Sequence, residues 1–159
     1  MKKYLVTGGA GFIGSHIVNS LLAKGHQVIV YDNFSAGKHE FINDAKSDKS
    51  FELVVGDLLD DRLLEKTLRG CDAVYHMAAN ADIRNGLVSP YRDIEQNTIA
   101  TFNLLEAMRK NNVRRIIFAS SAAALGEPEV FPTPESCAVP VQTSLYGASK
   151  MACEGLISS

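Results

Sequence analysis

The sequence predicts an α/β fold in which helices cover both faces of a doubly wound parallel sheet. Short apolar segments rich in Val, Ile, Tyr and Phe alternate with longer segments whose apolar residues recur at helical spacing. The apolar segments are nearly continuous, which is typical of strands buried on both faces. The chain has 159 residues, of which 46% are hydrophobic and 21% charged. We therefore expect residues 1–159 to form one globular domain.

Strands and helices are predicted to alternate along the chain. The strands are expected over Lys3–Val6, Gln27–Tyr31, Phe51–Val55, Ala73–His76 and Arg115–Ala119. The helices are expected from Phe12 to a stop at Gly25, and over Asp60–Arg69, Tyr91–Lys110 and Ser144–Ile157. Ser35–Asp48 is polar and weakly patterned, so a short helix and a loop are expected there. Right-handed strand–helix–strand crossovers then give a parallel sheet.

A long loop is predicted over Ser120–Thr143. It holds Pro128, Pro132, Pro134 and Pro140, which argue against a helix. A loop of this length in a compact domain is usually functional. The last predicted helix would normally lead into a further strand, and no residues remain for one. We therefore expect the chain to be part of a longer protein.

Composition excludes several classes of function. The net charge is −2, so no strong basic field favours nucleic acid as a partner. The basic residues near Lys110 flank a predicted helix end, where cations favour the helix dipole. Three cysteines without CxxC spacing predict neither a metal site nor disulfides, and a reducing, cytoplasmic location is the simplest setting. No apolar segment approaches the roughly 20 residues of a membrane span, so no membrane association is expected.

A glycine-rich turn follows the first predicted strand and opens the first predicted helix. Gly8, Gly11 and Gly14 have GxxGxxG spacing. Gly8 and Gly11 are expected to take positive φ and to leave no Cβ between backbone and ligand, and Gly14 to let the helix pack closely. A helix N-terminus offers free amides to a pyrophosphate, and this strand–turn–helix context favours a dinucleotide site. The predicted contacts are Gly8, Gly11, Phe12, Ile13 and Gly14.

Two acidic residues end the second and third predicted strands. Asp32 lies 18 residues after Gly14, where a carboxylate can accept both hydroxyls of an adenosine ribose. The same charge would repel a 2′-phosphate, so NAD is favoured over NADP. Asn33 and Ser35 are expected to add hydrogen bonds. Asp57 could meet the adenine amino group, but a role in stabilising its own turn is as well supported.

Tyr146 and Lys150 lie four residues apart on the last predicted helix and so share a face. A cation in that position can stabilise a phenolate. Such a pair is common on helices, and its place after the fifth strand of a dinucleotide fold is what favours catalysis. Ser120 and Ser121 follow the fifth strand, where ligands bind in open parallel sheets. A hydroxyl there can hydrogen-bond a reacting oxygen.

Together these segments resemble the extended short-chain dehydrogenase/reductase family, and within it the sugar-nucleotide 4-epimerases. The resemblance covers nearly the whole chain. The matching segments are Thr7–Gly14, Tyr31–Asn33, Gly56–Leu58, His76–Ala79, Asn97 with Thr101–Leu105, Ser120–Ala123 and Tyr146–Lys150. The resemblance implies that residues 1–159 are an NAD-binding Rossmann domain. It also implies that the last strands and the C-terminal substrate-binding part of the family are absent from this chain.

The resemblance further implies roles for individual residues. Ser121, Tyr146 and Lys150 would form a catalytic triad, and the additional cofactor contacts would be Leu58, Ala78, Ala79, Asn97, Tyr146 and Lys150. The implied reaction is NAD-dependent epimerisation at C4 of a nucleotide sugar of the UDP-glucose/UDP-galactose type, through a transient 4-keto intermediate. The implied partners are this nucleotide-sugar substrate and a second copy in a homodimer, through helices Tyr91–Lys110 and Ser144–Ile157.

Other functions on the same scaffold remain open. Sugar-nucleotide 4,6-dehydratases of this family place acidic residues directly after the catalytic hydroxyl residue. Ala122 and Ala123 stand there in this chain, which disfavours dehydration. A keto-sugar reductase is a further alternative. If the chain is really this short, a non-catalytic NAD-binding domain is the third.

Overall fold

The computed structural model describes residues 1–80, 82–137 and 141–159. The chain falls into two compact units. The first comprises Met1–Ala79 and Asn103–Ala119, and the second comprises Asn80–Phe102 and Ser120–Ser159. Pro140, one of the four prolines of the predicted loop, lies outside the described residues.

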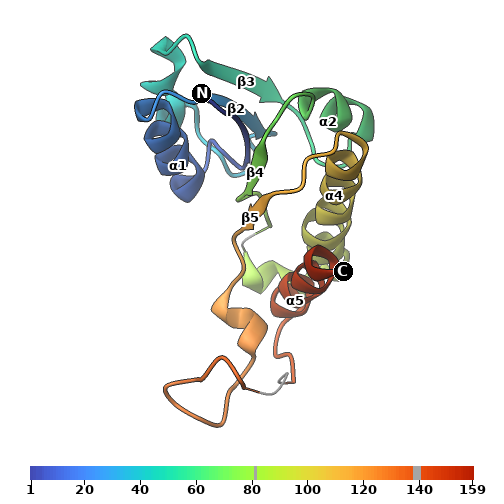
Figure 1. The fold of residues 1–159 in the computed structure, drawn as a ribbon. Helices are drawn as coiled ribbons and strands as arrows, with labels where there is room; N and C mark the ends of the chain where they lie inside the picture. Colours follow the sequence, from blue (N-terminus) through green and yellow to red (C-terminus); the bar gives the residue numbers. More distant parts are fainter. Residues whose placement is uncertain (81, 138–140) are drawn as a thin grey trace. The chain divides into compact units, whose positions relative to one another are not determined.

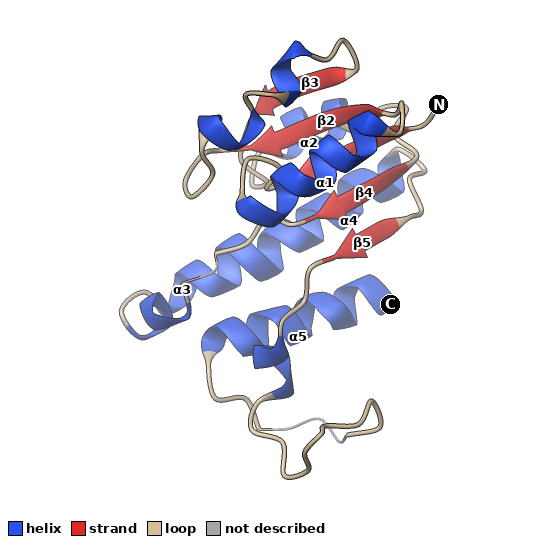
Figure 2. Cartoon of the chain, turned by 90° about the vertical axis from the view of Figure 1, so that its left-hand side faces the viewer, coloured by secondary structure: helices blue, strands red, loops and turns tan. Residues whose placement is uncertain are grey.

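The first unit is built around a five-stranded parallel sheet of order β3-β2-β1-β4-β5 (Figure 2). The strands are β1 (Lys3–Thr7), β2 (Gln27–Asp32), β3 (Phe51–Val55), β4 (Ala73–His76) and β5 (Ile116–Phe118). The chain winds outward from β1 to β3 and then returns to β4 on the other side of β1. This order confirms the predicted doubly wound fold.

The strand bounds follow the predicted ones closely. β3 and β4 coincide with their predicted segments, whereas β1 and β2 each run one residue further, to Thr7 and Asp32. The extra residue of β2 is explained by register, because Asp32 pairs with Val55 at the end of β3. β5 is one residue shorter at each end than predicted. Acidic Asp32 is thus the last residue of a strand, at the edge where parallel sheets bind ligands.

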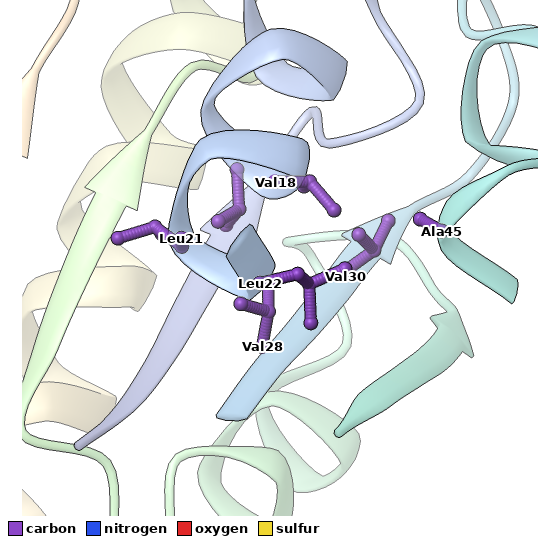
Figure 3. Close-up of a cluster of buried hydrophobic side chains, with 7 residues drawn as sticks. Val18, Leu21, Leu22, Val28, Val30 and Ala45 are labelled. Atoms are coloured by element: carbon purple, nitrogen blue, oxygen red, sulfur yellow. The ribbon is translucent and has the colours of Figure 1, made fainter. Parts of the chain in front are cut away.

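Helices cover both faces of this sheet. α1 (Phe12–Ala23) lies on one side, and α2 (Asp61–Thr67) with the Asn103–Lys110 part of α4 (Ala100–Lys110) lies on the other (Figure 1). Because strand side chains alternate, every second residue of β1 and β2 faces α1. Figure 3 shows the cluster that results, which comprises Val6, Val18, Leu21, Leu22, Val28, Val30 and Ala45. The intervening residues Leu5, Ile29 and Tyr31 are buried on the opposite face.

The segment between β2 and β3 forms two short 3-10 helices, η1 (His39–Ile42) and η2 (Ala45–Ser47). Their only buried residues are Ile42 and Ala45. Such sparse apolar positions cannot support a longer amphipathic helix, which agrees with the weak pattern of this stretch.

The second unit is helical. It contains η3 (Ile83–Leu87), α3 (Pro90–Asp93), η4 (Ile94–Ile99), the start of α4, η5 (Ala122–Leu125) and α5 (Leu145–Ser158). The prediction of a regular helix over Tyr91–Lys110 is wrong for η4, which is π-helical. The predicted loop also contains the η5 turn, because the Ser121 side chain caps it by accepting a hydrogen bond from Ala123 N. The start predicted for the last helix is confirmed, since the Ser144 side chain caps α5 by accepting from Gly147 N.

Candidate functional site

The glycine turn joins β1 to α1 and has two positions, Gly8 and Gly14, at which a side chain would not fit. Gly8 has φ +65°, as predicted, and a Cβ there would lie 2.6 Å from Ala78 N. A Cβ on Gly14 would overlap the carbonyl oxygen of Gly8, so helix and strand approach as closely as expected. The prediction for Gly11 is wrong in part, because its φ is −82°. Gly11 is the extended N-cap of α1, and what it needs is space, since a Cβ would lie 3.2 Å from Gly8 O.

The turn presents the positive end of α1 at the sheet edge. Gly11 N donates to Gly8 O (3.0 Å) and Gly8 N donates to Tyr31 O (2.9 Å), which fixes the turn against β2. The first amides of a helix have no acceptor within it. The first turn of α1 carries no acidic residue to neutralise them, and the side chain of Phe12 is 70% exposed. The arrangement suits an anion such as a pyrophosphate.

Asp32 is held against this turn by backbone amides. Its Oδ2 accepts from Ala10 N and its Oδ1 from Phe34 N, both at 2.9 Å. A carboxylate has about four acceptor sites. Two sites therefore remain for the hydroxyls of a ribose, although the side chain is largely buried.

Asp57 follows β3 and is held from three directions. Leu59 N donates to its Oδ1 (3.0 Å), and Asn33 Nδ2 donates to its Oδ2 (2.8 Å). The hydroxyl of Tyr31 donates to its carbonyl oxygen (2.8 Å). The bond from Leu59 means that Asp57 does stabilise its own turn, which was one of the two predicted roles. The sequence pattern does not reveal this role of Tyr31, because nothing in a strand pattern distinguishes a packing tyrosine from one that donates to a loop.

The remaining residues predicted for the cofactor in this unit surround the same edge. Ser35 N donates to Asn33 Oδ1 (3.0 Å), and buried Leu58 accepts at its carbonyl from Asn103 Nδ2 (3.2 Å). Ala78 N donates to Thr7 Oγ1 (3.3 Å), which brings Ala78, and Ala79 after it, beside Gly8. The first unit thus gathers every predicted nucleotide contact that precedes Asn97.

The second unit contains all three residues predicted for catalysis, Ser121, Tyr146 and Lys150. Lys150 Nζ lies 5.8 Å from the centroid of the Tyr146 ring, so the predicted shared face is confirmed. Lys150 is 3% exposed, and this burial lowers the pKa of its ammonium group. Ser121 Oγ accepts from Ala123 N (3.2 Å) at the start of η5. η5 packs on the first turn of α5, where a Cβ on Gly147 would overlap the Ala123 carbonyl oxygen.

Asn97, predicted as a cofactor contact, is buried in η4 and bonded within the protein. Its Oδ1 accepts from Asn80 N (2.8 Å), and its Nδ2 donates to Ser149 Oγ (2.9 Å). Ser149 Oγ donates in turn to Tyr146 O (2.7 Å). Cys153 Sγ donates to Asn97 O (3.4 Å), a carbonyl in the π-helical turn. Asn97 therefore anchors α5. Asn80, Ser149 and Cys153 could not be found from the sequence pattern, because their partners in this network are distant in the chain.

The part of the chain that the structure describes contains neither a candidate membrane span nor a candidate metal site. None of its helices combines the length and apolar character that crossing a membrane requires. Its His, Cys, Asp and Glu side chains form no group of three or more that could hold a metal ion.

Comparison with known proteins places these features in context. The model of the NAD dependent epimerase/dehydratase family matches residues 4–159. The chain is 43% identical over 152 residues to the UDP-glucose 4-epimerase of Halalkalibacterium halodurans, covering 94% of this chain and 43% of that protein. The chain spans about half the length of the curated relatives it matches.

Among solved structures, too, nucleotide-sugar 4-epimerases are similar to this chain. With a TM-score of 0.92, the chain is 38% identical to the UDP-N-acetylglucosamine 4-epimerase from Methanobrevibacter ruminantium M1 in complex with UDP-N-acetylmuramic acid, covering 99% of this chain and 49% of that one. The UDP-glucose 4-epimerase from Bifidobacterium longum in complex with NAD+ and UDP is 33% identical with a TM-score of 0.92, covering 99% of this chain and 48% of that one.

Proposed function

The chain belongs to the NAD dependent epimerase/dehydratase family, and on this basis we propose that it is the NAD-binding part of a nucleotide-sugar 4-epimerase. The substrate class we propose is a UDP-sugar of the UDP-glucose/UDP-galactose type. The observation that carries the proposal is the pairing of Tyr146 with the buried ammonium of Lys150, in the same unit as Ser121. A domain that only bound NAD would not need this pair.

The first unit has the features that binding NAD requires. No Cβ stands at Gly8, Gly11 or Gly14, which leaves room for a pyrophosphate on the free amides of α1. Asp32 would accept from the two hydroxyls of the adenosine ribose, and its charge disfavours a 2′-phosphate. Asp57 would accept from the adenine amino group. The further proposed contacts are Phe12, Ile13, Asn33, Ser35, Leu58, Ala78, Ala79, Asn97, Tyr146 and Lys150.

The second unit would supply the acid–base chemistry. The Tyr146 phenolate would remove the proton from the sugar 4-hydroxyl and later return it. Lys150 stabilises the phenolate by its charge, and Ser121 Oγ would hydrogen-bond the same sugar oxygen. The chemistry that bound NAD supplies is reversible acceptance of a hydride, which suits oxidation of the sugar at C4 and its reduction again. Inversion results when the 4-keto sugar presents its other face before it is reduced.

The residues after Ser121 favour epimerisation over dehydration. Ala122 and Ala123 open η5, and neither methyl side chain can donate or accept a proton. A 4,6-dehydratase needs an acid and a base to remove water from the sugar. The residues directly after Ser121 therefore favour epimerisation, in which the sugar loses no atoms, over dehydration, in which it loses water.

A homodimer is part of the proposal. Tyr91, Ile94 and Phe102 are 61%, 45% and 50% exposed on the stretch that runs from α3 into α4. Large apolar side chains exposed together on helical turns are typical of a protein interface. We expect light scattering to give the mass of a dimer, and Phe102→Glu to give a monomer. A monomeric wild-type protein would contradict this part of the proposal.

The decisive experiment measures interconversion of UDP-glucose and UDP-galactose by the natural protein that contains residues 1–159. Tyr146→Phe keeps the ring and removes the acid–base group, so kcat should fall by at least about 100-fold while NAD stays bound. Tyr4→Phe is the matched control, because Tyr4 packs against Tyr75 on the α1 face of the sheet. Turnover that survives in Tyr146→Phe, or a wild-type protein that binds NAD and converts neither sugar, would refute the epimerase proposal.

A further inference from the structure

Tyr31 places a buried phenol beneath the loop that follows β3. The side chain is 1% exposed, and it lies on the sheet face opposite α1 because Val28 and Val30, at odd spacings from it in the same strand, face α1. Its hydroxyl donates to Asp57 O at 2.8 Å. Burial, with the nearby charges of Asp60 and Asp57, raises the pKa of this phenol well above its usual range. The phenol is therefore protonated at neutral and moderately alkaline pH, so its hydroxyl acts as a donor to the loop.

The loop rests directly on this hydroxyl. A Cβ on Gly56 would lie 2.6 Å from the Tyr31 hydroxyl oxygen and 2.7 Å from Cδ2 of Leu63, so only glycine lets the backbone pass this close. Gly56 N also donates to Asp32 O (3.2 Å). The backbone of Gly56 and Asp57 is thus fixed to β2 by two hydrogen bonds, one of them from the phenol of Tyr31.

The carboxylate of Asp57 is fixed as well. Leu59 N and Asn33 Nδ2 each occupy one of its oxygens, which leaves the other lone pairs in defined directions. An acceptor held in this way distinguishes a ligand that offers a donor from one that offers another acceptor. The purine ring of a nucleotide has either an amino group or an oxo group at position 6. The amino group offers a donor to such a carboxylate, whereas the oxo group offers another acceptor.

We propose that Tyr31 is a specificity-determining residue of the nucleotide site, which acts by positioning Asp57 to prefer a 6-amino purine over a 6-oxo purine. The inference rests on the proposed function, since it takes Asp57 as the residue that faces the purine of NAD. Tyr31 does not contact the ligand in this scheme. Its effect on recognition passes through the Asp57 loop. Replacing Tyr31 should therefore change the ratio of the affinities for a 6-amino and a 6-oxo purine nucleotide.

The test is titration of the natural protein that contains residues 1–159, freed of any bound nucleotide, with ADP and with IDP, measured by calorimetry. These probes differ at purine position 6 and need only the part of the site that lies in the first unit. Wild-type protein should bind ADP about tenfold more tightly than IDP, the order expected for a hydrogen bond to an ionised acceptor. Tyr31→Phe should narrow that ratio to about threefold or less, by the loss of one positioning bond.

Two other variants complete the design. Tyr75→Phe should keep the wild-type ratio, because Tyr75 packs on the α1 face near Tyr4 and far from the loop in the sheet order. Gly56→Ala keeps the phenol but pushes the loop away from it, and should narrow the ratio as Tyr31→Phe does. If Tyr31→Phe does not fold, Gly56→Ala still tests whether contact with the phenol of Tyr31 sets the ADP/IDP affinity ratio.

The outcomes separate this inference from the proposed function. A ratio that is the same in wild type, Tyr31→Phe and Gly56→Ala overturns the role of Tyr31 and leaves the proposed NAD site intact. Equal affinity of the wild type for ADP and IDP overturns it in the same way. A wild-type chain that binds neither nucleotide contradicts the proposed cofactor site, and the role of Tyr31 with it.

Discussion

The ammonium of Lys150 lies over the ring of Tyr146, with Nζ 5.8 Å from the ring centroid. The two residues are one helical turn apart on α5, and both side chains are buried. A buried ammonium is costly because it loses its hydration. The pairing that suits an acid–base role therefore opposes the stability of the fold, a common conflict at functional sites.

The pH dependence of unfolding should reveal this cost. Burial lowers the pKa of Lys150 in the folded chain, so the unfolded chain binds more protons between the lowered pKa and the ordinary one. The free energy of unfolding contributed by this group therefore rises with pH across that window. Lys150→Met should stabilise the protein at pH 7 by about 1 kcal/mol, and the gain should shrink as the pH rises through the window.

Urea unfolding at a series of pH values measures this effect. Lys66→Met, at an exposed site in α2, is the control and should change stability by less than about 0.5 kcal/mol at each pH. A difference between wild type and Lys150→Met that is the same at every pH would contradict the expected cost of the buried charge.

Two glycines of α5 should respond oppositely to alanine. A Cβ on Gly147 would overlap the Ala123 carbonyl oxygen, whereas a Cβ on Gly155 meets nothing within 4 Å. Gly147→Ala should lower the free energy of unfolding by about 1–3 kcal/mol through overpacking. Gly155→Ala should raise it by about 0.5–1 kcal/mol through helix propensity. Thermal unfolding of the two variants compares them directly, and equal shifts would rule out tight packing of η5 on α5.

The Asn97–Ser149 bond should appear as a coupling energy. Asn97→Ala leaves the amide of Asn80 without its acceptor and the hydroxyl of Ser149 without its donor, and should cost about 2–3 kcal/mol. Ser149→Ala should cost about 1 kcal/mol. Because both changes break the same bond, the double variant should be less destabilised than the sum of the single ones. Additive effects in denaturant unfolding would mean that the bond does not anchor α5.

The three cysteines should differ in reactivity. Burial raises the pKa of Cys71 to about 11 and also raises the pKa of Cys153, whereas Cys137 is partly exposed. The thiolate is the reactive form of a cysteine. Cys137 should therefore react quickly with a disulfide reagent at pH 8, whereas Cys71 and Cys153 should react only after unfolding. Cys137→Ser should abolish the fast phase. A fast phase that persists in that variant would show that a buried thiol is accessible.

Most of the local framework could be predicted from the sequence. β3 and β4 match their predicted bounds, and α5 begins one residue after its predicted start, because apolar runs, glycines and capping side chains act over a few residues. The GxxGxxG spacing likewise predicted the close turn between β1 and α1. Gly11 is the exception, since only the packed turn decides whether a glycine is needed for its conformation or for its small size.

The sequence alone determined which segments become strands and helices, and which residue types stand at their ends, because those depend on burial pattern and local backbone preference. The tertiary structure alone decided that η4 would widen into a π-turn, that Tyr31 would hold the Asp57 loop, and that Asn97 would meet Ser149 across 52 residues of chain. Hydrogen-bond partners of this kind depend on which elements lie side by side, and that follows from packing rather than from any periodic pattern.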